Sequence, residues 1–195
     1  MTKIFFGTAL SALALVIPAA ASAQRIAPAV VAVVDTDRIA RECTACRAAS
    51  AQLQSQEASI RSRAQALQTQ IRTQGQPIEA AVAALNGKQP DAALKQRITA
   101  LQTQERNAQT ELATAQRNYQ SSQVHVSQQI RNRVIPIIGT VAQSRGAGIA
   151  IDRGAALYSA PAMDITTEVL AQLNRALPSV SVTPLPQQAQ QPTGR

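Results

Sequence analysis

The sequence is short of aromatic residues and of the residue types from which most catalytic sites are built. Its 195 residues contain two Phe, two Tyr and no Trp, and His125 is the single histidine. A large apolar core needs bulky side chains, so this chain can bury little surface in one globular domain. It has no Ser/His/Asp order, no Gly-rich phosphate loop and no cluster of metal-ligating residues. We therefore expect no enzyme, no metal and no cofactor.

Long apolar runs are also scarce, and the longest lies at the start of the chain. Lys3 precedes an apolar stretch from Ile4 to Ile17, and Ala21-Ser22-Ala23 has the small residues of a cleavage site. The stretch is shorter than the ~20 apolar residues that span a bilayer comfortably. The sequence therefore predicts a signal peptide over residues 1–23, cleaved after Ala23, and an exported protein. A signal anchor is the alternative.

Acidic residues are few in comparison with basic ones. Without residues 1–23 the chain keeps 18 basic and 11 acidic side chains, a net charge of +7. Residues 47–133 hold eleven of these basic residues and five of the acidic ones, and such a surface attracts anions. We expect acidic polypeptide or lipid headgroup phosphates as partners and no nucleic acid, because aromatic residues for base stacking are missing. Alternatively, the charge only keeps long helices soluble.

In place of a globular core, the chain has a regular helical pattern over residues 47–133. Gln, Ala, Arg, Ser and Thr dominate, and apolar residues recur at heptad spacing in both halves. These positions are Leu53, Ile60, Leu67, Ile71, Ile78 and Leu85 in the first half, and Leu94, Ile98, Leu101, Ala108, Leu112, Ala115, Tyr119 and Val126 in the second. The pattern predicts two long helices that pack along narrow seams as an antiparallel, coiled-coil-like hairpin arm.

Residues that disfavour helix divide this stretch. Gly87 and Pro90 place the tip of the hairpin at residues 86–90, and Asp91 suits the first turn of the next helix. Two helices of about 40 residues would reach ~60 Å at 1.5 Å per residue. Gly75 and Pro77 fall inside the first helix and predict a kink or break there.

The flanking segments, residues 24–46 and 134–177, predict a small α+β body of three short strands and helix ends. Two β-branched runs, around Val31 and Val33 and around Ile149 and Ile151, are typical of buried strands, and Ala156-Leu157-Tyr158 predicts the third. Asp164 can cap a last helix that ends near Leu177. So small a body is marginal alone, so we expect it to self-associate through these strands. Residues 178–195, rich in Pro, Gln, Ser and Thr, predict a disordered tail.

Cys43 and Cys46 form the one motif with reactive potential. In an oxidising compartment two cysteines three apart can form a local disulfide, and the same spacing serves thiol-disulfide exchange. The pair is not placed directly after a strand of a thioredoxin-like domain, which favours a disulfide or unreactive thiols over redox activity. A structural zinc site would need four ligands, and this chain offers two cysteines and one distant histidine, which disfavours zinc.

Taken in order, the segments VAVVDTDRIA, the Gln-rich hairpin, GIAIDRGAALY and DITTEVLAQLN resemble the Skp/OmpH family of periplasmic chaperones. The resemblance spans about residues 29–175. It implies a homotrimer whose strands form a central body, with helical arms that enclose a cavity for unfolded outer-membrane proteins in the periplasm. The expected function is that of an ATP-independent holdase.

Under this hypothesis the basic face of the arm binds clients diffusely. The candidate client-binding residues are Arg61, Arg63, Arg72, Lys88, Lys95, Arg97, Arg106 and Arg117. A structural coiled-coil spacer of the cell envelope is the alternative, and a dithiol redox protein using Cys43 and Cys46 is a third. The interrupted, Ala-diluted seam favours the holdase, since a rigid spacer should sustain its heptads.

Overall fold

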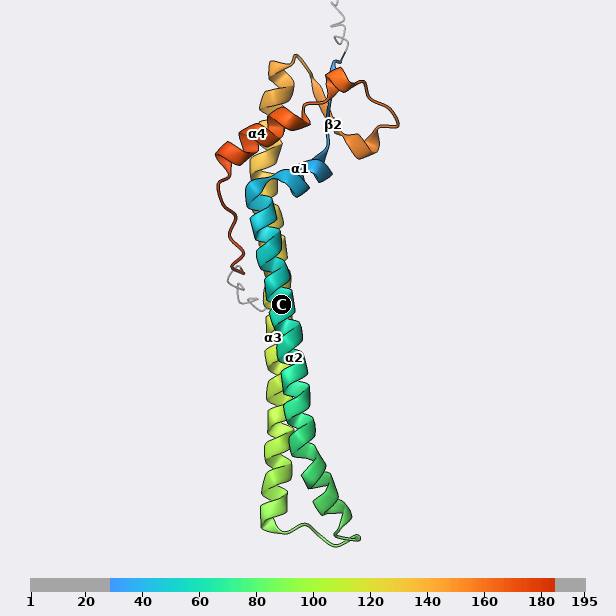
Figure 1. Ribbon diagram of the computed structural model, residues 1–195, viewed down its shortest axis with the longest axis vertical. Helices are drawn as coiled ribbons and strands as arrows, with labels where there is room; N and C mark the ends of the chain where they lie inside the picture. Colours follow the sequence, from blue (N-terminus) through green and yellow to red (C-terminus); the bar gives the residue numbers. More distant parts are fainter. Residues whose placement is uncertain (1–28, 185–195) are drawn as a thin grey trace, which may run out of the picture.

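The computed structural model describes residues 29–184 and has a small body at one end of a long helical arm (Figure 1). The predicted signal peptide lies outside the described residues. The elements in chain order are β1 (Val31–Val34), α1 (Thr36–Glu42), α2 (Thr44–Ala83), α3 (Ala92–Ser144), β2 (Ile149–Asp152), the 3-10 turns η1 (Arg153–Ala155) and η2 (Pro161–Met163), and α4 (Thr166–Ala176).

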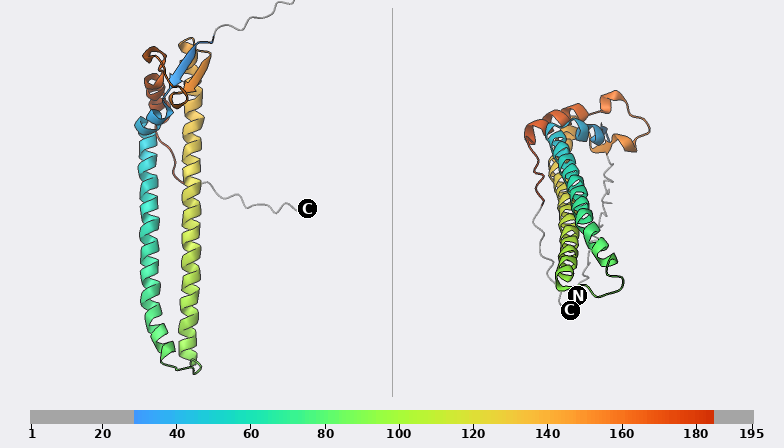
Figure 2. Two further views of the ribbon diagram at one scale, coloured as in Figure 1. Left: turned by 90° about the vertical axis from the view of Figure 1, so that its right-hand side faces the viewer. Right: turned by 60° about the horizontal axis from the view of Figure 1, so that its bottom comes forward.

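The arm consists of α2, which leads away from the body, and α3, which returns beside it (Figure 2). Arg63 on α2 bonds Glu111 on α3 at 2.6 Å, and Gly75 faces Leu101. All the apolar positions of the predicted seams are buried or half-buried, whereas most other side chains of the two helices are exposed. The heptad pattern therefore identified the residues that hold the arm together.

The sequence predicts a kink or a break at Gly75 and Pro77; helix α2 is unbroken through both residues, so a break is wrong. Gly75 and Ile78 are buried against α3, and a β-carbon at Gly75 would lie 3.7 Å from Leu101 Cδ2. This packing on both sides of the proline compensates for the one helical hydrogen bond that Pro77 cannot donate. The last turns of α2 still swing away from α3 in Figure 1.

The tip of the arm has the turn and the helix cap that Gly87 and Asp91 predicted. Helix α2 ends at Ala83, and Asn86 and Gly87 take positive φ values of 48° and 86°, which glycine and asparagine tolerate best. Asp91 then accepts a hydrogen bond from the backbone N–H of Leu94 at 2.7 Å and caps α3.

Helix α3 crosses from the arm into the body without interruption. Its 53 residues include Pro136, and it ends at Ser144. Just beyond that end Gly146 has φ of +72°, and Ala147 N–H bonds the carbonyl oxygen of Ala142 at 2.9 Å. Val141 and Ala142 are buried in the body, so the same helix serves the arm seam and the body core.

The described residues form a sheet of two strands, and the expected third strand at Ala156-Leu157-Tyr158 was wrong. Strands β1 and β2 are parallel, with Val31 opposite Ile149 and Val33 opposite Ile151. After β2 the Asp152 carboxylate accepts the Gly154 N–H at 2.8 Å and turns the chain into η1. Leu157 and Tyr158 follow in an exposed loop.

The body core lies where α1, α3 and α4 meet, and it contains no aromatic side chain. Its most deeply buried members are Cys43, Val141, Val169 and Leu173, all at most 1% exposed. Within the part of the chain that the structure describes, no helix combines the length and apolar character of a membrane span.

Residues 178–184 differ from the predicted disordered tail, because they lie against the arm next to the body. Val180 packs on the core cluster, and Ser181 hydrogen-bonds to Gln129 of α3. The rest of the predicted tail lies beyond the described residues.

Candidate functional site

The eight basic residues predicted to bind clients are all exposed, and they lie along both helices of the arm and at its tip. Four have partners nearby. Arg61 pairs with Glu57 at 2.8 Å, Arg63 pairs with Glu111, and Arg106 and Arg117 each donate to a threonine one turn earlier. The surface ion pairs are open to water and contribute little to stability.

The other four basic residues make no ion pair among the described residues. They are Arg72 on α2, Lys88 in the tip, and Lys95 and Arg97 on α3. All four belong to the half of the arm that is farther from the body. Arg47, Arg131 and Arg133, nearer the body, are also exposed and make no ion pair among the described residues, so cations available to an anionic partner lie along the whole arm.

Between α2 and α3 the arm surface is hollowed into shallow, open grooves. One, of about 710 Å³, is lined mostly by Gln, Thr and Asn side chains, and another, of about 490 Å³, contains more apolar atoms. Leu67 and Ala108 of the seam line both grooves. Such grooves offer many weak contacts and no enclosed pocket for a small molecule.

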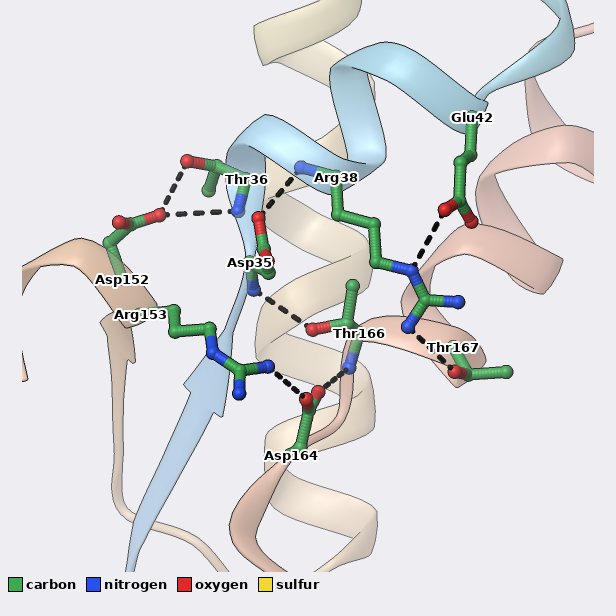
Figure 3. A network of polar contacts seen from close by, with 9 residues as sticks. All are labelled: Asp35, Thr36, Arg38, Glu42, Asp152, Arg153, Asp164, Thr166 and Thr167. Carbon is green, nitrogen blue, oxygen red and sulfur yellow. Dashed lines mark hydrogen bonds and ion pairs between the residues drawn. The ribbon is translucent and has the colours of Figure 1, made fainter. Parts of the chain in front are cut away.

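A polar network in the body fixes the strands to α1 and α4 (Figure 3). Asp35 caps α1 by accepting the Arg38 N–H at 2.7 Å, and its own N–H donates to Thr166 Oγ1 at 2.9 Å. Asp152 accepts from the hydroxyl and the backbone N–H of Thr36. Capping α1 and bonding Thr36 thus account for the Asp35 and Asp152 carboxylates.

The network lowers the pKa of two carboxyl groups. Hydrogen bonds from the Thr36 side chain and the Gly154 backbone hold the pKa of Asp152 below its ordinary value. Burial raises the pKa of Asp164, but hydrogen bonds from Thr166 and the charge of Arg153, 3.1 Å away, outweigh burial, and the pKa lies below the usual range. Both groups therefore favour the folded body in their ionised form.

Cys43 and Cys46 are joined by a disulfide at the corner between α1 and α2, with their Cα atoms 5.1 Å apart. Cys43 is 0% exposed and Cys46 is 5% exposed, and both belong to the body core. Exchange with another protein needs an accessible sulfur, so this burial favours a structural role. Within the described chain no three His, Cys, Asp or Glu residues are grouped as a metal site.

The residues that sequence reasoning missed are those of the segment 178–184 and the arm positions beneath it. Gln56 and Gln129 bond its backbone, and Ser122 is buried below it with an unpaired hydroxyl. The signal was present, because Val180, Val182 and Pro184 alternate with polar residues. Period-two alternation is typical of an extended chain with one face against a surface.

Acid should destabilise the body through Asp152 and Asp164. Because their pKa values are lower in the folded state, their stabilising contribution is present above the unfolded value, ordinarily 3.8, and is lost as pH falls through the folded value. We expect Asp152→Asn to unfold more easily than the unchanged protein at pH 6 and to lose less stability between pH 5 and 3. Urea unfolding at each pH measures this. The exposed Asp37→Asn is the control, and an unchanged pH dependence in Asp152→Asn would refute the assignment.

Replacing Cys43 and Cys46 together by Ala should lower the free energy of unfolding by at most about 2–4 kcal/mol, because the disulfide closes a very short loop. Circular dichroism should show the same helix content. In an insulin-reduction assay we expect the unchanged protein and the variant to be equally inactive. Disulfide reduction that disappears in the variant would support the dithiol redox hypothesis instead.

Comparison with known proteins agrees with this architecture. The chain matches the family model described as "Outer membrane protein (OmpH-like)" over residues 30–173. It is similar to the crystal structure of a candidate outer membrane chaperone (OmpH-like) from Caulobacter crescentus, with a TM-score of 0.68, 19% identity, and 95% of this chain and 99% of that chain covered. No curated protein matches the chain. Since the family match covers the body and the whole arm, the chain belongs to the OmpH-like family.

Proposed function

We propose that the protein is an ATP-independent holdase chaperone of the periplasm, which binds unfolded outer-membrane proteins and prevents their aggregation before insertion. One observation carries the proposal: a long, exposed arm of two packed helices with unpaired cations and open grooves, on a fold shared with a candidate outer membrane chaperone. The predicted signal peptide, removed after Ala23, would deliver the protein to that compartment.

The body favours assembly into a homotrimer. A two-stranded sheet is marginal alone, and β2 has only one partner strand among the described elements. Val33 is already buried within the single chain, whereas Val30 and Ile149 are 55% and 47% exposed. We propose that these exposed residues, with the outer edge of β2, contact another copy, and that Val31 and Ile151 support them from within the body. Three antiparallel hairpin arms would then enclose the client.

The arms suit a binder that must accept many sequences and release them. Gln and Arg stems can lie on apolar segments while their polar ends stay in water, and the grooves spread contact over a wide area. The unpaired cations would attract acidic segments of a client from a distance. The phosphates of anionic lipid headgroups would meet the same cations.

We expect the half of the arm farther from the body to control capture of an acidic client, because it is the part that can reach around a bound chain. Replacing Arg72, Lys88, Lys95 and Arg97 by Gln should weaken capture of an unfolded acidic outer-membrane β-barrel about tenfold at low salt, and much less at 0.5 M salt, where charges are screened. Fluorescence anisotropy of the labelled client in dilute urea measures the affinity.

A matched variant separates position from net charge. Arg41, Arg47, Arg131 and Arg133 are also exposed but lie at or near the body, and their replacement by Gln changes the net charge equally. We expect this variant to retain most of the affinity. Equal losses in both variants would mean that the distal arm is not the capture surface.

Shortening the arm should abolish protection of large clients and leave the body intact. Removing residues 72–82 and 94–104 takes about three helical turns from each helix and keeps the tip and the helical phase. We expect sedimentation to show the same trimer and light scattering to show renewed aggregation of a diluted, denatured β-barrel. If the shortened protein still protects, the arm serves as a spacer.

A further inference from the structure

Residues 178–184, which we call the C-terminal segment, lie along the arm next to the body. They leave α4 and run beside the arm toward the tip, as the dark red trace in Figure 1 shows. The segment forms neither helix nor strand. It nevertheless contacts both arm helices, because Ser181 bonds Gln129 of α3 and the carbonyl of Val182 bonds Gln56 of α2.

The arm recognises the backbone of this segment and not its polar side chains. The Gln129 amide donates to the Ser181 carbonyl oxygen at 2.9 Å and accepts the Ser181 N–H at 3.1 Å. Gln56 Nε2 donates to the Val182 carbonyl oxygen at 3.4 Å. A side-chain amide that pairs with both backbone groups of one residue imitates a neighbouring β-strand, and such pairing is available to any extended chain except at proline.

Apolar side chains occupy every second position of the segment and are less exposed than the polar side chains between them. Val180, Val182 and Pro184 are half-buried, whereas Ser181 and Thr183 between them are exposed. Val180 packs against the body core. The segment therefore lies as a strand would lie, with one apolar face inward and one polar face in water.

The surface continues into a groove where the described segment ends. Pro184 lines this groove of about 330 Å³ together with Ile60, Tyr119 and Ser122. Ser122 is 1% exposed, and its hydroxyl has no hydrogen-bond partner in the described structure. A buried, unpaired hydroxyl beside an open groove is a polar group that a bound chain can satisfy.

We propose that this face of the arm is a binding site for extended polypeptide with apolar side chains at every second position, and that the C-terminal segment occupies it until a client displaces it. The identity of the client rests on the proposed function, since strands of outer-membrane β-barrels alternate in this way. The site recognises the backbone of a bound chain through Gln56 and Gln129. It recognises the alternation of apolar side chains through the apolar groove residues Ile60 and Tyr119.

Because the C-terminal segment is tethered to the site, a competing ligand must reach a high local concentration to displace it. A segment on a short linker acts at an effective concentration in the millimolar range, so an isolated weak ligand competes poorly. A long unfolded chain already held elsewhere on the arm is tethered in the same way and can displace the segment. The site would thus be reserved for chains that the arm has captured.

A substitution in the full-length protein tests the proposal. Ser181→Pro removes the N–H that Gln129 accepts, whereas Ser181→Ala removes only the hydroxyl and keeps both backbone groups. The probe is a fluorescein-labelled peptide with the sequence of residues 178–184, measured by anisotropy. We expect Ser181→Pro to bind the probe about tenfold more tightly than the unchanged protein, because its own segment is released, and Ser181→Ala to bind no more tightly.

Two further comparisons test what the site reads. Adding Gln129→Ala to the Ser181→Pro protein should reduce probe binding about tenfold, whereas adding Gln128→Ala, which changes an exposed neighbour, should not. A peptide of the same composition with its two valines adjacent should bind several-fold more weakly. Thermal melts monitored by circular dichroism establish that each variant is folded.

Equal probe binding by folded Ser181→Pro and Ser181→Ala would overturn the proposal. The C-terminal segment would then only stabilise the fold. Equal binding of the probe and of the peptide with adjacent valines would show that the site does not recognise alternating apolar side chains. Suppression of β-barrel aggregation by the unchanged protein is measured separately, so a failed holdase with a working peptide site is distinguishable from a working holdase without one.

Discussion

Helix α3 is buried along one narrow stripe for most of its length, and that stripe supports both parts of the protein. Toward the tip Leu94 and Ala108 pack on α2, and at the other end Val141 and Ala142 enter the body core. A chain with almost no aromatic residues cannot build two separate cores of useful size. One continuous helix shared by the arm and the body is the solution that this composition allows.

The thin seam has a consequence for the surface of the arm. Because only about one apolar residue per turn of each helix forms the seam between α2 and α3, most of the remaining positions are polar and in contact with water. The two grooves beside Leu67 are consequently open, one lined mostly by Gln, Thr and Asn and the other more apolar. A surface of this kind makes weak, numerous contacts, and weak contacts are reversible.

At the body the strands, α1 and α4 are joined by polar contacts as much as by apolar ones. Thr166, at the start of α4, accepts the N–H of Asp35 just after β1, and Asp152 connects the end of β2 to Thr36 (Figure 3). The Cys43–Cys46 disulfide lies in the core at the corner where the arm departs. These bonds compensate for a core that lacks large side chains, and they fix the direction in which the arm leaves the body.

The sequence alone determined the features that depend on neighbouring residues: the seam positions, the turn at Gly87 and the Asp91 cap. Local propensity and heptad spacing specify each of these without distant contacts. Only the tertiary structure decided that α2 continues through Pro77, that the cysteines are buried, and that residues 178–184 lie on the arm. Each of these depends on contacts between segments far apart in the chain, where packing against α3 or a glutamine amide outweighs the local preference for a break or a disordered tail.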